Sequence, residues 1–151
     1  MSLARAGLLV ALIVVVASAS CTSTSPTPAP VDTCALVPNM DELVGHAAVD
    51  RPGAFTLNGV ERCIWTYATT PARSVGISVA NILAHGSAIE TLGDGEPVPD
   101  LGNDARWWPG NHMLSIALGE RSLQVDLQLD AAESTRDLAV QIARAAIERL
   151  G

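Results

Sequence analysis

The stretch Cys63-Ile64-Trp65-Thr66-Tyr67 decides how the folded part of this 151-residue chain is built. Its pattern of residue types is typical of a β-strand, in which successive side chains point to opposite faces of the sheet. Cys63, Trp65 and Tyr67 then share one face, which gathers a cysteine and two of the five aromatic residues of the chain. We expect the hydrophobic core to form on that face.

The cysteines predict a covalent link to this strand. If Cys21 carries a lipid, Cys34 and Cys63 remain, and two such cysteines outside the cytoplasm most often pair. A disulfide between Cys34 and Cys63 would staple the N-terminal segment over the face of Trp65. The alternative is a redox or catalytic thiol, which the lack of a Cys-x-x-Cys motif disfavours.

The start of the chain has the layout of a secretory signal peptide. Arg5 precedes an apolar run from Gly7 to Ala17, and small residues follow. The run is shorter than the ~20 apolar residues of a membrane-spanning helix. Small residues before Cys21 resemble a bacterial lipobox, although Ser18 stands where leucine is usual. We expect lipidation (palmitate) at Cys21; the alternatives are a secreted protein and an uncleaved anchor.

A segment dominated by Pro, Ser and Thr follows Cys21 and continues to Pro30. Such a segment cannot bury a core and stays extended and solvated, as the spacer of a surface-anchored domain does. The sequence therefore predicts three parts. They are a signal peptide over 1–20, a lipidated cysteine with a flexible tether over 21–32, and a single domain over 33–151.

The pattern of this domain predicts an α+β fold. We expect an antiparallel sheet of four to five strands, with a short N-terminal helix and a C-terminal amphipathic helix packed on one face. The clearest alternation lies over Leu123–Leu129 and indicates a sheet with one dry and one wet face. The other expected strands cover 63–67, 74–82, 105–108 and 113–118; helices cover 40–44 and 83–92; loops cover 46–61 and 93–103.

The last helix is the element that we expect to cover the dry face. Two candidate capping boxes precede it, Asp130 with Glu133 and Ser134 with Asp137. Helical spacing brings its apolar residues to one side. These are Ala139, Ile142, Ala143, Ala146, Ile147 and Leu150.

Several short motifs, in this order, resemble a family of small actinobacterial lipoproteins. They are a lipobox, a Ser/Thr/Pro tether, Cys34-Ala35-Leu36, Cys63-Ile64-Trp65 and the segment Leu101-Gly102-Asn103-Asp104-Ala105-Arg106-Trp107. Some members carry a second cysteine pair, which this chain lacks. The resemblance covers most of the chain after the leader. It implies an envelope lipoprotein of α+β fold and no known reaction.

The charge of the chain excludes one class of partner. Its net charge is −7, so it repels phosphate backbones, and we expect no nucleic-acid binding. The sequence has no Gly-x-Ser-x-Gly and no His-Glu-x-x-His motif. His46, His85 and His112 are far apart and are predicted to be surface or loop residues. We therefore predict no catalytic residue, no cofactor and no metal.

An acidic loop offers a weaker, alternative prediction of a calcium site. Calcium takes oxygen ligands outside the cell, but the spacing here fits no known calcium loop. A solvated loop is the favoured interpretation. The oxygen-bearing residues are Asp94, Glu96, Asp100, Asn103 and Asp104.

The pair Trp107-Trp108 is the candidate contact surface. Adjacent strand residues point to opposite faces, so one indole enters the core and the other lies on the far side. If that side is wet, an exposed aromatic ring marks a contact site for a sugar, peptide or lipid. The favoured alternative is that a loop or the short helix covers it.

Together these features predict a non-catalytic binding or interaction module at the outer face of the cytoplasmic membrane. The protein is held at the membrane through the lipid on Cys21, or it is secreted if the lipobox is not used. The partner would be an unknown envelope protein, a cell-wall component or a lipid. The alternative is a lipid or small-molecule carrier with an apolar pocket between sheet and helix, and an enzyme comes third. A cavity would favour the carrier, and a filled core the module.

Overall fold

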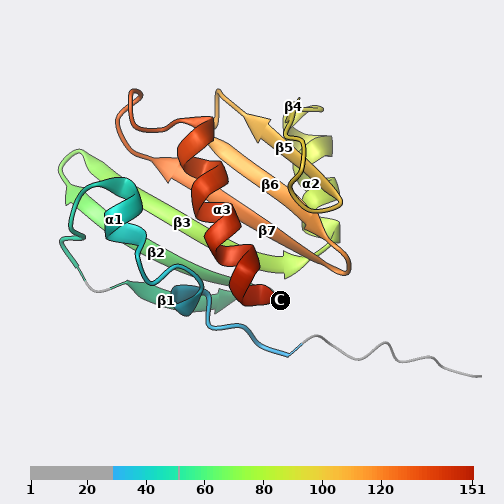
Figure 1. Ribbon diagram of the computed structural model, residues 1–151, viewed down its shortest axis with the longest axis horizontal. Helices are drawn as coiled ribbons and strands as arrows, with labels where there is room; N and C mark the ends of the chain where they lie inside the picture. Colours follow the sequence, from blue (N-terminus) through green and yellow to red (C-terminus); the bar gives the residue numbers. More distant parts are fainter. Residues whose placement is uncertain (1–28, 51) are drawn as a thin grey trace, which may run out of the picture.

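The computed structural model describes residues 29–50 and 52–151. The predicted signal peptide, Cys21 and the first part of the tether lie outside the described residues. One antiparallel sheet of seven strands forms the centre, in the order β1-β2-β3-β7-β6-β5-β4 (Figure 1). The α+β class is confirmed, and the sheet is larger than the four to five strands expected.

Every predicted helix and strand is present, and η1, β1 and β4 are additional elements. In chain order, the elements are η1 (Thr33–Leu36), α1 (Met40–Val44), β1 (Gly53–Leu57), β2 (Val60–Thr69), β3 (Ala72–Asn81), α2 (Leu83–Leu92), β4 (Glu96–Pro97), β5 (Asp104–Trp108), β6 (Met113–Leu118), β7 (Arg121–Gln128) and α3 (Arg136–Leu150).

Two strands lie in segments that were expected to be loops. All five residues of β1 are exposed. A strand with no buried face does not require alternating apolar and polar residues, which is the pattern that identifies a strand in a sequence. Strand β4 has only two residues, which is too short for any periodicity.

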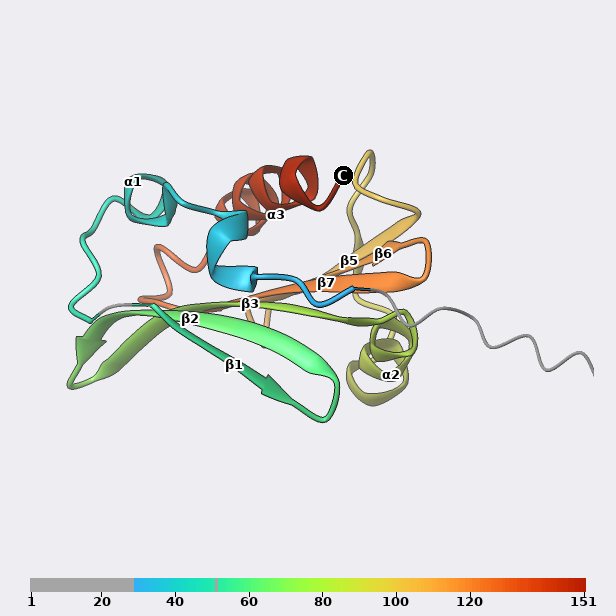
Figure 2. The same cartoon turned by 90° about the horizontal axis from the view of Figure 1, so that it is seen from below.

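The sheet has helices on both faces. α1, η1 and α3 lie on one face, which we call the α3 face, and α2 lies on the other, the α2 face (Figure 2). Trp65 pairs with Val75, and Val75 pairs with Leu127, so their side chains share the α3 face. The core therefore forms on the face of Cys63 and Trp65, and α3 covers it as predicted.

Small residues let α3 lie close to the sheet. Ala139, Ala143 and Ala146 are fully buried, together with Ile142. The capping prediction was wrong. Neither proposed box forms the cap; the side chain of Thr135 accepts a hydrogen bond from the Leu138 backbone N–H instead. Threonine is itself a favoured N-cap residue because its hydroxyl satisfies a free N–H of the first turn.

The disulfide between Cys34 and Cys63 is confirmed, with a Cα–Cα distance of 5.1 Å. Cys34 lies in η1, whose first turn is capped by the side chain of Asp32. Cys63 is fully buried in β2. The bridge thus holds the N-terminal segment against the α3 face of the sheet.

Candidate functional site

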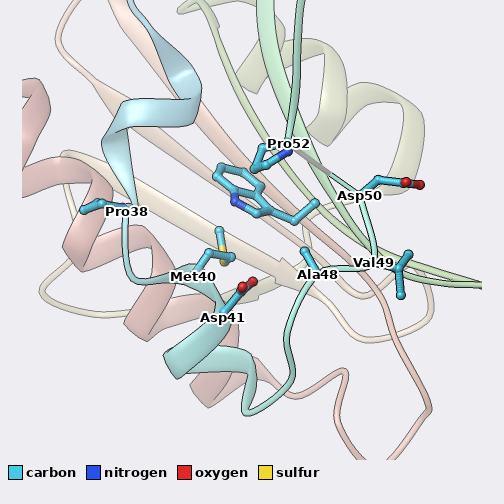
Figure 3. A pocket seen from close by; sticks show the side chains of 8 residues that line it. Pro38, Met40, Asp41, Ala48, Val49, Asp50 and Pro52 are labelled. Atoms are coloured by element: carbon cyan, nitrogen blue, oxygen red, sulfur yellow. The ribbon is translucent and has the colours of Figure 1, made fainter.

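A cleft of about 370 Å³ opens beside Trp65, between α1 and the loop that leads to β1. Figure 3 shows the side chains around it: Met40 and Asp41 reach in from α1, and Pro52 closes the opposite side. The lining residues are Pro38, Met40, Asp41, Ala48, Val49, Asp50, Pro52 and Trp65. Six of these are apolar and two are carboxylates.

The floor of the cleft belongs to the core. Trp65 and Met40 are almost fully buried, whereas Val49 is 56% exposed at the rim. The accessible surface of the cleft is therefore more polar than apolar, because its largest apolar side chains are buried beneath it.

Tyr67 fixes one of the carboxylates. Its hydroxyl donates a hydrogen bond to Asp41 Oδ1 at 3.2 Å, which links β2 to α1. Burial raises the pKa of the Tyr67 hydroxyl, and the negative charge of Asp41 and this hydrogen bond raise it further. The hydroxyl therefore stays protonated at physiological pH and remains a donor to Asp41.

Two contacts hold the loop that forms the outer wall. The backbone N–H of Val49 donates to the carbonyl of Thr66 at 2.8 Å. His46 Nε2 lies 2.8 Å from Glu133 Oε1, and this hydrogen bond is the main reason that the pKa of Glu133 is lowered. His46 is thus an exposed loop residue, as predicted, and it connects the wall to the segment before α3.

Trp107 and Trp108 are both buried, so neither ring is exposed as the contact-surface prediction requires. They point to opposite faces, as predicted, but each side chain is only 4% exposed. Trp108 lies on the α2 face, where its Nε1 donates to the Gly93 carbonyl at 2.9 Å. Gly95 lets the backbone lie against the indole, since a Cβ there would be 2.8 Å from the ring. The loop after α2 therefore covers this tryptophan.

His85 is neither a surface nor a loop residue, and that prediction was wrong. It lies in α2, is 5% exposed, and its Nδ1 is 2.9 Å from Ser115 Oγ. Its Nε2 is 3.1 Å from Asp104 Oδ2, and Arg106 Nε donates to Asp104 Oδ1 at 3.0 Å. These four polar groups fasten α2 to the sheet. A buried imidazole needs hydrogen-bond partners, and Ser115 and Asp104 of the sheet supply them.

The order Ser115, His85, Asp104 has the residue types of an acyl-transfer triad. A nucleophile must be reached by its substrate, and the Ser115 side chain has no exposed surface. The arrangement can therefore position α2, but it does not present a hydroxyl to a substrate.

This network makes stability depend on pH. Burial acts to raise the pKa of Asp104, but the hydrogen bonds with His85 and Arg106 and the positive charge of Arg106 outweigh it and hold the pKa below its usual value. A lowered pKa in the folded state stabilises the fold above the unfolded-state value, and this contribution disappears as the pH falls through the folded-state pKa. Asp104→Asn is therefore expected to lower the melting temperature at neutral pH and to converge with the parent protein in acid.

Thermal unfolding between pH 7 and pH 2 measures this difference, with Asp94→Asn, in an exposed loop, as the matched control. A difference between Asp104→Asn and the parent that stays constant down to the lowest pH would contradict the assignment.

The acidic loop does not come together as a calcium site. Within residues 29–50 and 52–151, no three His, Cys, Asp or Glu side chains are grouped so that they could hold a metal ion. Asp104, one of the five candidates, is bound to His85 and Arg106 instead. No helix in the described part of the chain is long and apolar enough to cross a membrane.

Comparisons of this chain with protein-family models, with curated proteins and with solved structures found no match.

Proposed function

We propose that this protein is an envelope lipoprotein, anchored through Cys21 at the outer face of the cytoplasmic membrane, that binds a partner without catalysis. The contact site in this proposal is the cleft beside Trp65, and the observation that supports it is the pair of carboxylates among the residues that line this cleft. The disulfide supports a location outside the cytoplasm, because such bridges persist in oxidising compartments.

The chemistry of the cleft favours a positively charged partner. Asp41 points into the cleft beside Met40, and Asp50 adds a second carboxylate on the outer wall, directed away from Asp41 (Figure 3). The charged heads of arginine and lysine side chains pair with carboxylates, and their apolar stems can lie against the smaller apolar part of the lining. The partner is then a basic segment of an envelope protein, which the acidic net charge of −7 also attracts.

The alternative carrier function needs an apolar pocket between the sheet and α3. The side chains between these two layers are shielded from solvent: Ile142 and Ala143 of α3 and Leu114, Leu123 and Val125 of the sheet are all fully buried. The lack of exposed surface on these side chains supports the binding module over the carrier.

A photo-activated cross-linking residue at position 49 tests the proposal in cells. Val49 is 56% exposed on the rim of the cleft. We expect a defined cross-linked partner in the membrane fraction, and we expect Asp41→Asn combined with Asp50→Asn to abolish it. Cys21→Ser should release the protein from that fraction.

Two controls make the result specific. The same probe at Leu83, which is 75% exposed on α2, should not give this product. Asp137→Asn, an exposed acid of α3, should leave cross-linking at position 49 unchanged. Identical products from positions 49 and 83, or a product that survives loss of both cleft carboxylates, would refute the cleft as the site.

A further inference from the structure

The two edges of the sheet differ in how they are protected. Natural proteins blunt an edge strand with charge, proline, a bulge or short length, because unpaired backbone groups otherwise attract another strand. The β4 edge has only two residues, one of them a proline. Strand β1, at the other edge, has five uncharged residues without proline, and it pairs with β2 without a register shift.

The free backbone groups of β1 can be assigned from its hairpin. Leu57 pairs with Val60 across the two-residue turn Asn58-Gly59, and the residues that flank such a turn exchange hydrogen bonds. By alternation Phe55 and Gly53 also bond to β2. The N–H and C=O groups of Ala54 and Thr56 therefore point away from the sheet.

These groups are complementary to themselves. If two β1 strands meet antiparallel about a two-fold axis at Phe55, Ala54 of each copy faces the partner's Thr56. Each Ala54 then exchanges hydrogen bonds with the partner's Thr56. A register centred on Ala54 would place Pro52, which has no N–H, opposite the partner's Thr56 and leave the Thr56 carbonyl unpaired, and one centred on Thr56 would involve the turn. Phe55 faces the partner's Phe55 in a close pair without backbone hydrogen bonds.

The side chains on the α2 face fit the same register. Phe55 and Leu57 are 45% and 62% exposed there, beyond the cover of α2. In this register Leu57 lies opposite the partner's Gly53, and nothing lies within 4 Å of the place where a Cβ of Gly53 would be. Ile64 pairs with Gly53 within each copy. Leu57 of one copy thus enters the open space over Gly53 of the other copy, next to its Ile64.

We propose that β1 is a homodimerisation edge, where it pairs with β1 of a second copy in the register that places Phe55 opposite the partner's Phe55. The dimer has one continuous sheet, with both α3 helices on the same side. The cleft beside Trp65 lies on the α3 face, so pairing of β1 and binding at the cleft involve different faces. The paired segment is short, so dissociation at low concentration is expected, and the tests trap the pair covalently or produce both copies together at high concentration.

Cysteine cross-linking of the full, exported chain tests the register. Residues opposite one another in a pair without backbone hydrogen bonds have Cα atoms about 4.5 Å apart, within the range that a disulfide spans. Phe55→Cys should therefore give a reductant-sensitive dimer linked through residue 55, located by peptide mapping. Leu57→Cys is the matched control, because it is more exposed but faces Gly53 rather than itself.

The parent chain should give no covalent dimer. Absence of a link through residue 55, or a link through residue 57 of equal yield, overturns the proposal.

A charge-swap experiment tests the same contact without a covalent bond. Two differently tagged copies of the chain are produced together, and recovery of one tag with the other is measured. Phe55→Lys in both copies, or Phe55→Glu in both, places like charges opposite one another and should abolish recovery. Phe55→Lys in one copy with Phe55→Glu in the other should restore it.

Restoration requires that residue 55 faces itself, and it also shows that both variants are folded. Tags that never co-purify in the parent protein, or recovery that no Phe55 variant changes, would overturn the proposal and leave β1 to a different partner strand or to none.

Discussion

Loss of the disulfide between Cys34 and Cys63 is expected to lower the free energy of unfolding by roughly 3 to 4 kcal/mol. The bridge joins residues 29 apart in sequence, and closing a loop of this length restricts the unfolded chain by about that amount in the chain-entropy model. For a domain of this size the melting temperature should fall by about 10–15 °C. Thermal or denaturant unfolding of Cys34→Ser measures the change.

The position of the disulfide in the fold is a second reason to expect a large loss of stability. Cys63 is at the centre of the core, and Cys34 holds η1 on the α3 face. Without the link, only the non-covalent packing of η1 remains.

Adding reductant and replacing the cysteines distinguish the effect of the disulfide bond from the effect of changing the two side chains. Addition of reductant to the parent protein should reproduce most of the loss seen in Cys34→Ser. The double variant Cys34→Ser with Cys63→Ala should not respond to reductant at all. A double variant with the stability of the parent protein would show that the bridge does not stabilise the fold.

Gly102→Ala is expected to cost roughly 2–5 kcal/mol, although it adds only one methyl group. Gly102 has φ of +67°, a conformation that costs other residues about 1–2 kcal/mol. A Cβ there would lie 2.6 Å from the Ala117 carbonyl oxygen and 2.6 Å from Ile116 Cγ2. Forced overpacking of this kind costs about 1–3 kcal/mol more, because a backbone atom cannot move aside easily.

Gly110→Ala is the matched control, since nothing lies within 4 Å of its Cβ position and its φ is not positive. It should change stability little. Denaturant unfolding of both variants compares them directly, and equal stability of the two would contradict the contact at Gly102.

The contact between Gly102 and Ala117 also explains the role of the motif Leu101-Gly102-Asn103, which the sequence alone did not reveal. In Leu101-Gly102-Asn103, the leucine is buried and the Asn103 N–H donates to the Ala117 carbonyl at 2.8 Å. The Asn103 side chain accepts a hydrogen bond from the Gly119 N–H at 2.9 Å. The motif therefore docks one loop on the end of β6, and its residues are structural.

Local signals were sufficient for the elements with strong periodicity. The alternation over β7 and the limits of α1, α2 and β6 agree with the sequence-based prediction. Strand β1 was missed, although Asn58-Gly59 is the strongest short hairpin signal that a sequence offers. Its five residues are exposed on both faces, so the turn was the only evidence for it.

The sequence by itself determined the α+β class, the face on which the core forms and the pairing of Cys34 with Cys63. These depend on side-chain periodicity and on the number of cysteines, which are properties of the chain alone. Only the tertiary structure decided that Trp108 is covered, that His85 is buried against Ser115, and that a cleft opens beside Trp65. Each of these depends on which distant segment lies over a given strand, and long-range packing of that kind leaves no periodic trace in the sequence.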